Sequence, residues 1–142
     1  MKNNLFDTAE NALLEILKRE ITGEDGTEKM ELSVAGLNAV MRLAQEHAVA
    51  GLLANAAVRN RIVIAEGAAE GRGEAVMKLM QQTMAHRQGM QRCEDVVGRF
   101  ARLMKDNGIA YVVFNGLAVA SQYPEPFART MGDVALYVPQ GD

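Results

Sequence analysis

Apolar residues return every three or four positions along most of the first hundred residues, the spacing that places them on one face of a helix. The first such stretch predicts a helix that ends near Ile21, where a turn containing two glycines follows. We expect Asn4 or Asp7 to cap its start, because a short polar side chain can accept a hydrogen bond from an unpaired amide of the first turn.

Two further helices are predicted in the first half of the chain. The second fits residues 34–47 with Ser33 as its N-cap, and the third fits residues 49–58. Three glycines and no long apolar side chain then mark residues 65–73 as a glycine-rich loop. Residues 1–64 are therefore predicted to form an N-terminal helical region.

The longest periodic stretch follows this loop and predicts one long helix. Its apolar positions recur at steps of three or four: Val76, Leu79, Met80, Met84, Met90, Cys93, Val97, Phe100, Leu103 and Met104. The helix is expected to end at residues 105–108, where Asn107 or Gly108 suits a left-handed backbone. With such an apolar stripe, we expect it to pack across the whole domain.

After the long helix, the pattern changes to β-branched and aromatic residues, which favour strands. Residues 109–114 predict a buried strand, and residues 133–138 predict a second strand. Between them, a turn at Asn115 and Gly116 leads into a short helix over residues 117–122. The prolines that follow end this helix, since proline has no amide hydrogen to donate.

These elements predict an α/β (α+β) fold that is mainly helical at its N-terminus. Residues 74–142 are expected to hold the long helix and the first strands of a sheet core. Two strands make a marginal sheet, because three or more are usually needed. We therefore expect that the chain is a fragment, or that another molecule completes the sheet.

The composition excludes several classes of function. The net charge is −3 with acids and bases interspersed, so no extended nucleic-acid surface is expected. No stretch approaches the roughly 20 apolar residues that span a bilayer, so no membrane partner is expected. The single cysteine, Cys93, fits a reducing compartment, and the N-terminus does not resemble a secretory signal. The expected location is the cytoplasm.

A motif near the C-terminus carries the most chemistry, in the stretch GIAYVVFNGLAVASQYPEPFARTMGDVALYV. It resembles the bacterial uncharacterised nucleotidyltransferases of the polymerase-beta-like superfamily. Their pattern is a strand ending in Lys-Gly, a short helix reaching Tyr-Pro-x-Pro, and an Arg before Gly-Asp-(Ile/Val)-Asp on the next strand. The positions that match in order and spacing are Gly116, Tyr123, Pro124, Pro126, Arg129, Gly132 and Asp133.

The resemblance implies a nucleotidyltransferase-fold core and metal-dependent transfer of a nucleotide from a nucleoside triphosphate to an unknown acceptor. Asp133 would be the catalytic residue and a Mg²⁺ ligand, because Asp-x-Asp presents two carboxylates on one face of a strand. Gly116 would let backbone amides approach the phosphates. Arg129 would bind a phosphate or form a salt bridge to Glu125 or Asp133. Asn115 would donate a hydrogen bond to the nucleotide.

Two positions depart from the family pattern. Ala135 stands where the second carboxylate is expected, and Asn115 stands where the pattern has lysine. A methyl group cannot ligate a metal, so Asp133 alone would give a weak Mg²⁺ site. The changes are either natural, giving a degenerate enzyme, or engineered to trap an inactive form, or compensated by ligands from further chain.

Two functions of different classes follow. The first is metal-dependent nucleotidyl transfer, impaired or lost in this chain. The second is a non-catalytic helical module that keeps the fold and binds a partner or a nucleotide. Ala135 and Asn115 favour the second, and the surrounding motif favours the first.

The open edge of an unfinished sheet also predicts a homodimer, because unpaired strand edges invite pairing between chains. Light scattering of a concentrated sample is expected to give the mass of two chains. A strict monomer at high concentration would contradict this prediction.

Overall fold

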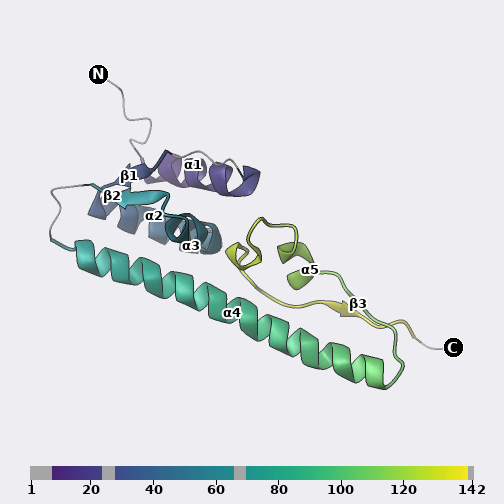
Figure 1. Cartoon of the computed structure of the whole chain (residues 1–142). Coiled ribbons are helices and arrows are strands. Elements are labelled where there is room, and N and C mark those ends of the chain that lie inside the picture. Colours follow the sequence, from purple (N-terminus) through teal and green to yellow (C-terminus); the bar gives the residue numbers. More distant parts are fainter. Residues whose placement is uncertain (1–7, 24–27, 66–69, 141–142) are drawn as a thin grey trace.

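Five helices, two pairs of short strands and one 3-10 turn succeed one another in the computed structural model, which describes residues 8–23, 28–65 and 70–140. The elements are α1 (Ala9–Thr22), β1 (Met30–Leu32), α2 (Val34–Glu46), α3 (Ala50–Val58), β2 (Ile62–Ile64), α4 (Arg72–Asp106), β3 (Val112–Val113), α5 (Leu117–Ala120), η1 (Pro126–Ala128) and β4 (Leu136–Tyr137). The predicted α+β class with a helical N-terminal region is confirmed (Figure 1).

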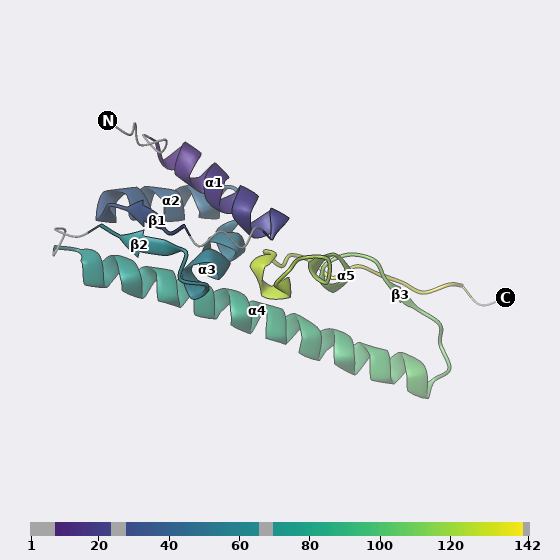
Figure 2. The same ribbon diagram turned by 45° about the horizontal axis from the view of Figure 1, so that its top comes forward.

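Helices α1, α2 and α3 pack around the main hydrophobic core (Figures 1 and 2). Leu37, Val40 and Leu53 are completely buried at its centre. Ser33 caps α2 as predicted, since its hydroxyl accepts a hydrogen bond from the Gly36 amide. The N-cap of α1 is Thr8, not the predicted Asn4 or Asp7, which lie outside the described residues.

A two-stranded parallel sheet covers part of this core, and the sequence did not predict it. Met30 pairs with Ile62 and Leu32 pairs with Ile64. Parallel strands need a long crossover between them, and here α2 and α3 provide it. Each strand has only three residues, too few for an alternating pattern to stand out from the helical periodicity around it.

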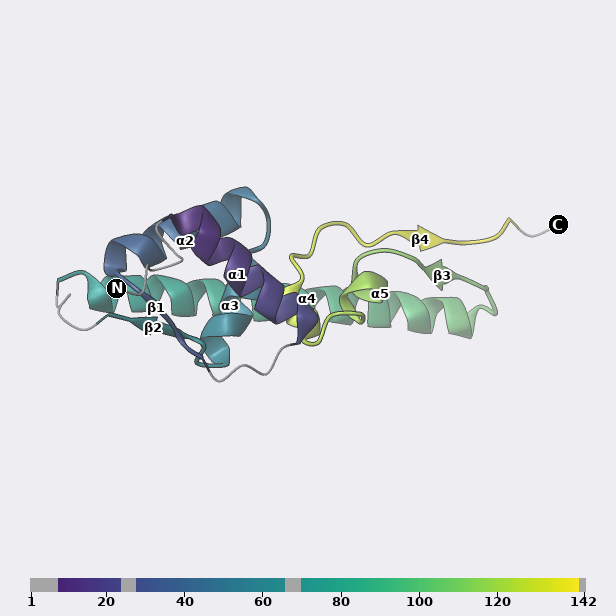
Figure 3. The same cartoon turned by 90° about the horizontal axis from the view of Figure 1, so that it is seen from above.

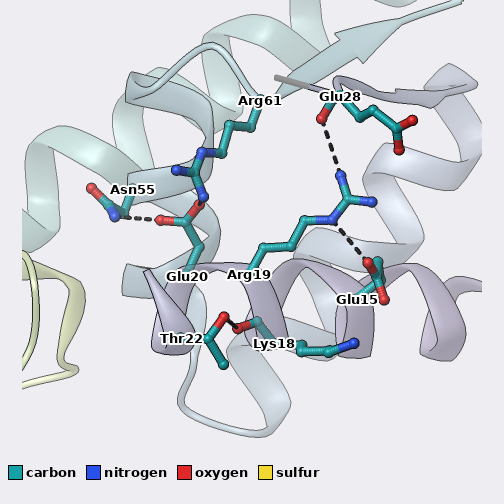
Figure 4. A network of polar contacts seen from close by, with 8 residues as sticks. All are labelled: Glu15, Lys18, Arg19, Glu20, Thr22, Glu28, Asn55 and Arg61. Carbon is teal, nitrogen blue, oxygen red and sulfur yellow. Dashed lines mark hydrogen bonds and ion pairs between the residues drawn. The ribbon is translucent and has the colours of Figure 1, made fainter. Parts of the chain in front are cut away.

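A buried carboxylate joins α1 to the turn after α3 (Figure 4). The Glu20 side chain lies in the interior, where Asn55 Nδ2 donates a hydrogen bond to Glu20 Oε2. Arg61 Nη1 lies 3.0 Å from Glu20 Oε1 and supplies the opposite charge. A buried ion needs such partners, because moving a charge out of water costs on the order of several kcal/mol of solvation free energy. The network therefore fixes the position of α1.

The long helix α4 has 35 residues and is about 52 Å long. Its N-terminal half lies under α2 and α3, and its C-terminal half runs beside the C-terminal segment of the chain (Figure 3). Among its described residues only Ala75 and Met90 are buried, and Met77, Met80 and Met84 are more than half exposed. The expectation of a helix packed throughout was wrong, because its neighbours cover only one side.

The predicted strands near the C-terminus form a two-stranded antiparallel ribbon, in which Val112 pairs with Tyr137 and Val113 with Leu136. The strand expected at residues 109–114 is shorter than predicted and is not buried, since Val112 is 55% exposed and Phe114 is 59% exposed. The inner face meets α4, where the rings of Tyr111 and Phe100 make an edge-to-face contact at 5.5 Å. No described element packs over the outer face of the ribbon.

The turn η1 connects this ribbon to the helical region. Ala128 lies buried against Gly51 of α3. A methyl group added at Gly51 would overlap the carbonyl oxygen of Ala128 and come within 2.8 Å of its carbonyl carbon. On the other side of η1, the guanidinium of Arg87 on α4 lies over the ring of Phe127 at 4.9 Å. These contacts hold η1 between α3 and α4.

None of the helices in the described part of the chain has the length and apolar character needed to cross a membrane.

We predict that Gly51→Ala lowers the free energy of unfolding by about 1–3 kcal/mol, because the new methyl group collides with backbone that cannot rotate away. Amide exchange at Ala128, whose N–H bonds the carbonyl of Glu125, should accelerate. Gly98→Ala is the control, since nothing lies within 4 Å of the new methyl group. It should raise stability by about 0.5–1 kcal/mol. Equal stability of the two variants would contradict the contact.

Candidate functional site

The ribbon register brings Asp133 next to Gly116. The pairing of Val113 with Leu136 continues toward α5, because the amide of Phe114 donates to the carbonyl of Ala135 at 3.2 Å. Two places further, the backbone of Gly116 faces that of Asp133: a Cβ added at Gly116 would lie 3.1 Å from the Asp133 carbonyl oxygen. Two site residues that are 17 positions apart in the predicted motif are thus neighbours across the ribbon.

Gly116 and Asp133 share one face of the ribbon with Phe114 and Ala135. Directly opposed residues in an antiparallel pair share a face, as do residues two apart on one strand. Gly116, Phe114, Asp133 and Ala135 therefore lie on one face, and Asp133 is exposed there. The position of the second carboxylate of the family pattern, Ala135, is on the same face as Asp133.

Glycine is required at position 116. Its backbone has φ +64° and ψ −107°, a conformation that residues with a Cβ rarely adopt. The residue is buried beneath Asp133 and Val134 and begins α5. The tight passage from β3 into α5 thus depends on the absence of a side chain.

The amide of Gly116 is already engaged. It donates a hydrogen bond of 2.8 Å to the side-chain oxygen of Asn115, the residue directly before it. A phosphate that approached this amide would have to displace the Asn115 side chain. The predicted nucleotide-binding roles of Asn115 and Gly116 therefore compete with each other in this conformation.

Arg129 lies at the other end of the segment that leads to Asp133. Its Nη1 donates to the carbonyl of Thr130 at 3.4 Å and lies 3.9 Å from Met131 Sδ. Among the described residues it forms no ion pair, so the alternative of a salt bridge to Glu125 or Asp133 is not realised. Its other guanidinium N–H groups have no partner in the part of the chain that the structure describes, so they can bind an anion.

Met131 connects these groups, although no sequence signal distinguishes it as a site residue. Its Cε lies 3.5 Å from the position of a Cβ on Gly116, and its Sδ faces Arg129. The thioether thus packs between the turn at Gly116 and the guanidinium. Methionine fills irregular gaps well, which suits this place, but no sequence pattern distinguishes it from the other methionines.

The described residues do not fit a two-metal site. Nowhere in the described part of the chain do three His, Cys, Asp or Glu side chains gather closely enough to hold a metal ion. Asp133 supplies one carboxylate, and Ala135 supplies a methyl group at the second position. Mg²⁺ is usually held by one or two carboxylates together with substrate phosphates, so one exposed carboxylate offers little affinity.

The part of the chain that carries these residues is similar to a known protein family. A family model described as "Uncharacterised nucleotidyltransferase" matches residues 34–142, which include α2 to β4 and every site residue named above. No curated protein and no solved structure matches the chain.

We predict that Gly116→Ala lowers the free energy of unfolding by about 1–3 kcal/mol, because alanine is strained at this φ and its methyl group presses on Asp133. Amide exchange at Phe114, which bonds Ala135, should accelerate as the ribbon loosens. Gly108→Ala is the matched control: it has a similar φ of +65°, but nothing lies within 4 Å of its new methyl group. Faster exchange at Phe114 in both variants would show that backbone strain, not the contact with Asp133, is responsible.

Proposed function

This chain belongs to the uncharacterised nucleotidyltransferase family, and we propose that it binds a nucleoside triphosphate at the ribbon face carrying Gly116 and Asp133. We propose further that it transfers the nucleotide poorly or not at all, because Ala135 replaces the second carboxylate. The proposal rests on the adjacency of Gly116 and Asp133 across the ribbon.

The adjacent groups suit the recognition of phosphates. The Arg129 guanidinium lies beside Met131 and has N–H groups without a partner among the described residues, and a planar guanidinium can bind two phosphate oxygens together. The Gly116 amide can bind a phosphate once the phosphate displaces the Asn115 side-chain oxygen that now accepts from it. Asp133 is exposed, so a ligand can reach its carboxylate without rearrangement of the fold.

As an enzyme, the site is limited by its single carboxylate, which gives too little negative charge to hold metal ions firmly. Nucleotidyl transfer needs the charge of the triphosphate to be neutralised while the new bond forms, and two metal ions commonly do this. One carboxylate on this face attracts such ions weakly. We therefore propose that this chain by itself carries out Mg²⁺-dependent transfer to an acceptor poorly or not at all.

A non-catalytic nucleotide-binding module is the second candidate function. Ala135 favours it directly, since a methyl group stands where the family pattern has a metal-binding carboxylate. Asn115 favours it too, because its side chain satisfies the Gly116 amide within the protein and provides no positive charge for a phosphate.

We predict that Ala135→Asp creates Mg²⁺-dependent binding of nucleoside triphosphates that the parent chain lacks. The new carboxylate lies on the face of Asp133, so both can share a metal with the phosphates. Isothermal titration calorimetry of parent and variant, with and without Mg²⁺, measures the gain, which should be about tenfold or more in affinity.

Ala135→Asn is the matched control, because it adds a side chain of similar size without the charge. Adding Asp133→Asn to the Ala135→Asp variant should remove the gain. If Ala135→Asp binds no better than Ala135→Asn with Mg²⁺ present, the ribbon face is not a disabled metal site, and the binding-module function is favoured.

A further inference from the structure

An apolar groove of about 390 Å³ lies between β2 and the N-terminal half of α4. Ile62 and Ile64 form its strand wall, and the helical wall includes Leu79, Met80 and Met84. The residues that line the groove are all uncharged, so it offers no charge to bind a phosphate or a metal ion. The groove is at the opposite end of α4 from the ribbon (Figure 3) and is therefore separate from the proposed nucleotide site.

The strand wall of the groove has an open edge. Among the described residues, β2 pairs with β1 and with no other strand. The carbonyl of Arg61 accepts a hydrogen bond from β1, and the amide of Ala65 donates one to β1. Because alternate residues of a strand bond to the same neighbour, residues 61, 63 and 65 face β1. The backbone N–H and C=O groups of Ile62 and Ile64 therefore point to the open edge.

These outward backbone groups indicate what kind of ligand the groove takes. In the described part of the chain, the N–H and C=O groups of Ile62 and Ile64 have no main-chain partner. Unpaired groups along a strand edge are a template for a further strand. They repeat every second residue, about 6.6 Å apart, which is the spacing of the same groups in another extended chain. The edge therefore favours an extended peptide as the ligand.

The two walls of the groove have similar lengths. The three residues of β2 extend about 10 Å, and α4 extends about 12 Å from Val76 to Met84. Ile62 and Ile64 are two positions apart, so their side chains lie on one face of the strand, and both line the groove. A strand added at the open edge would continue this face. Its alternate side chains would then point toward the helical wall.

Methionines form much of the exposed part of the helical wall. Met80 is 57% exposed and Met84 is 58% exposed, and the exposed side chains of Val58 and Val76 lie in the same lining. Neighbouring exposed apolar side chains of this kind are typical of binding surfaces. The unbranched thioether of methionine adapts to apolar side chains of different shapes. The helical wall therefore suits a range of apolar side chains.

The size of the groove favours a short segment over a second folded chain. A stable interface between folded proteins uses roughly 20–30 residues on each side. The groove offers a strand of three residues and one face of α4 from Val76 to Met84. An extended segment of about five residues would cover this length.

We propose that this groove binds an extended apolar segment of a partner protein, which adds to β2 as a third strand. The backbone of the segment pairs with Ile62 and Ile64, and its alternate side chains are apolar and pack against Leu79, Met80 and Met84. In this mode of recognition, main-chain hydrogen bonds give affinity and the contacts of alternate side chains give specificity. The proposal does not depend on nucleotide binding.

The test uses the full chain and a library of heptapeptides with the pattern Lys-X-Thr-X-Thr-X-Lys, in which X is Val, Ile, Leu, Met or Phe. We expect selected peptides to bind with a micromolar Kd in fluorescence polarisation. Met80→Gln should raise this Kd about fivefold or more, because it places an amide against apolar side chains. Met77→Gln is the matched control. Met77 lies on the same helix and is 58% exposed, but it does not line the groove, so Kd should stay unchanged.

Hydrogen exchange gives a second readout that reports strand pairing itself. Exchange at the amides of Ile62 and Ile64 should slow when the peptide binds, because both amides become paired. The amide of Val63 already faces β1, so its exchange should change little.

N-methylation of the peptide tests the same hydrogen bonds from the other side. One peptide is methylated at the amides of its X residues and a second at those of its threonines. Only alternate amides of a strand face a given neighbour, so one of the two peptides should lose binding and the other should keep it. Loss at the X residues indicates an antiparallel strand, and loss at the threonines indicates a parallel one.

Four results would overturn the proposal. The first is that no peptide of the library binds at millimolar concentration. The second is an equal loss of affinity in Met80→Gln and Met77→Gln, and the third is undiminished binding of both methylated peptides. The fourth is a dimer of the chain that dissociates in Met80→Gln but not in Met77→Gln, which would show that a second copy covers the groove.

Discussion

The missing side chain of Gly51 is the constraint on which the arrangement of the two halves of the molecule depends. It allows the backbone at Ala128 to lie directly on α3, where any Cβ would collide with it. Backbone-to-backbone contact of this kind has no adjustable side chain between the partners, so the position of η1 follows from the position of α3. The segment from Arg129 to Asp133 begins at this fixed point.

The same segment contacts three parts of the molecule in turn. Thr130 lies opposite the middle of α4, Met131 packs beside Gly116, and the backbone of Asp133 lies close to that glycine. Because the three residues lie within four successive positions, a shift of η1 would move them together. Gly51 and Gly116 hold the two ends of the segment, because the backbone approaches each of them closely. The candidate site residue Arg129 lies between these two contacts.

The sequence predicted most helix bounds well, because caps and turns such as Ser33 leave distinct signals. It also placed Gly116 and Asp133 in one motif, although only the antiparallel register shows that they touch. It did not predict the parallel strands, which are too short to show a period, or the exposure of α4, which depends on how far its neighbours extend. The contact of Gly51 with Ala128 joins residues far apart in the chain, and no local pattern encodes it.

The buried carboxylate of Glu20 has a consequence for where this domain starts. The family match begins at residue 34, yet α1 and β1 precede it. A protein trimmed to the matched region would leave Asn55 and Arg61 facing an empty space in place of Glu20, and would strip β2 of its parallel neighbour. The unit that folds is therefore larger than the region that the family model matches, and α1 is an integral part of it.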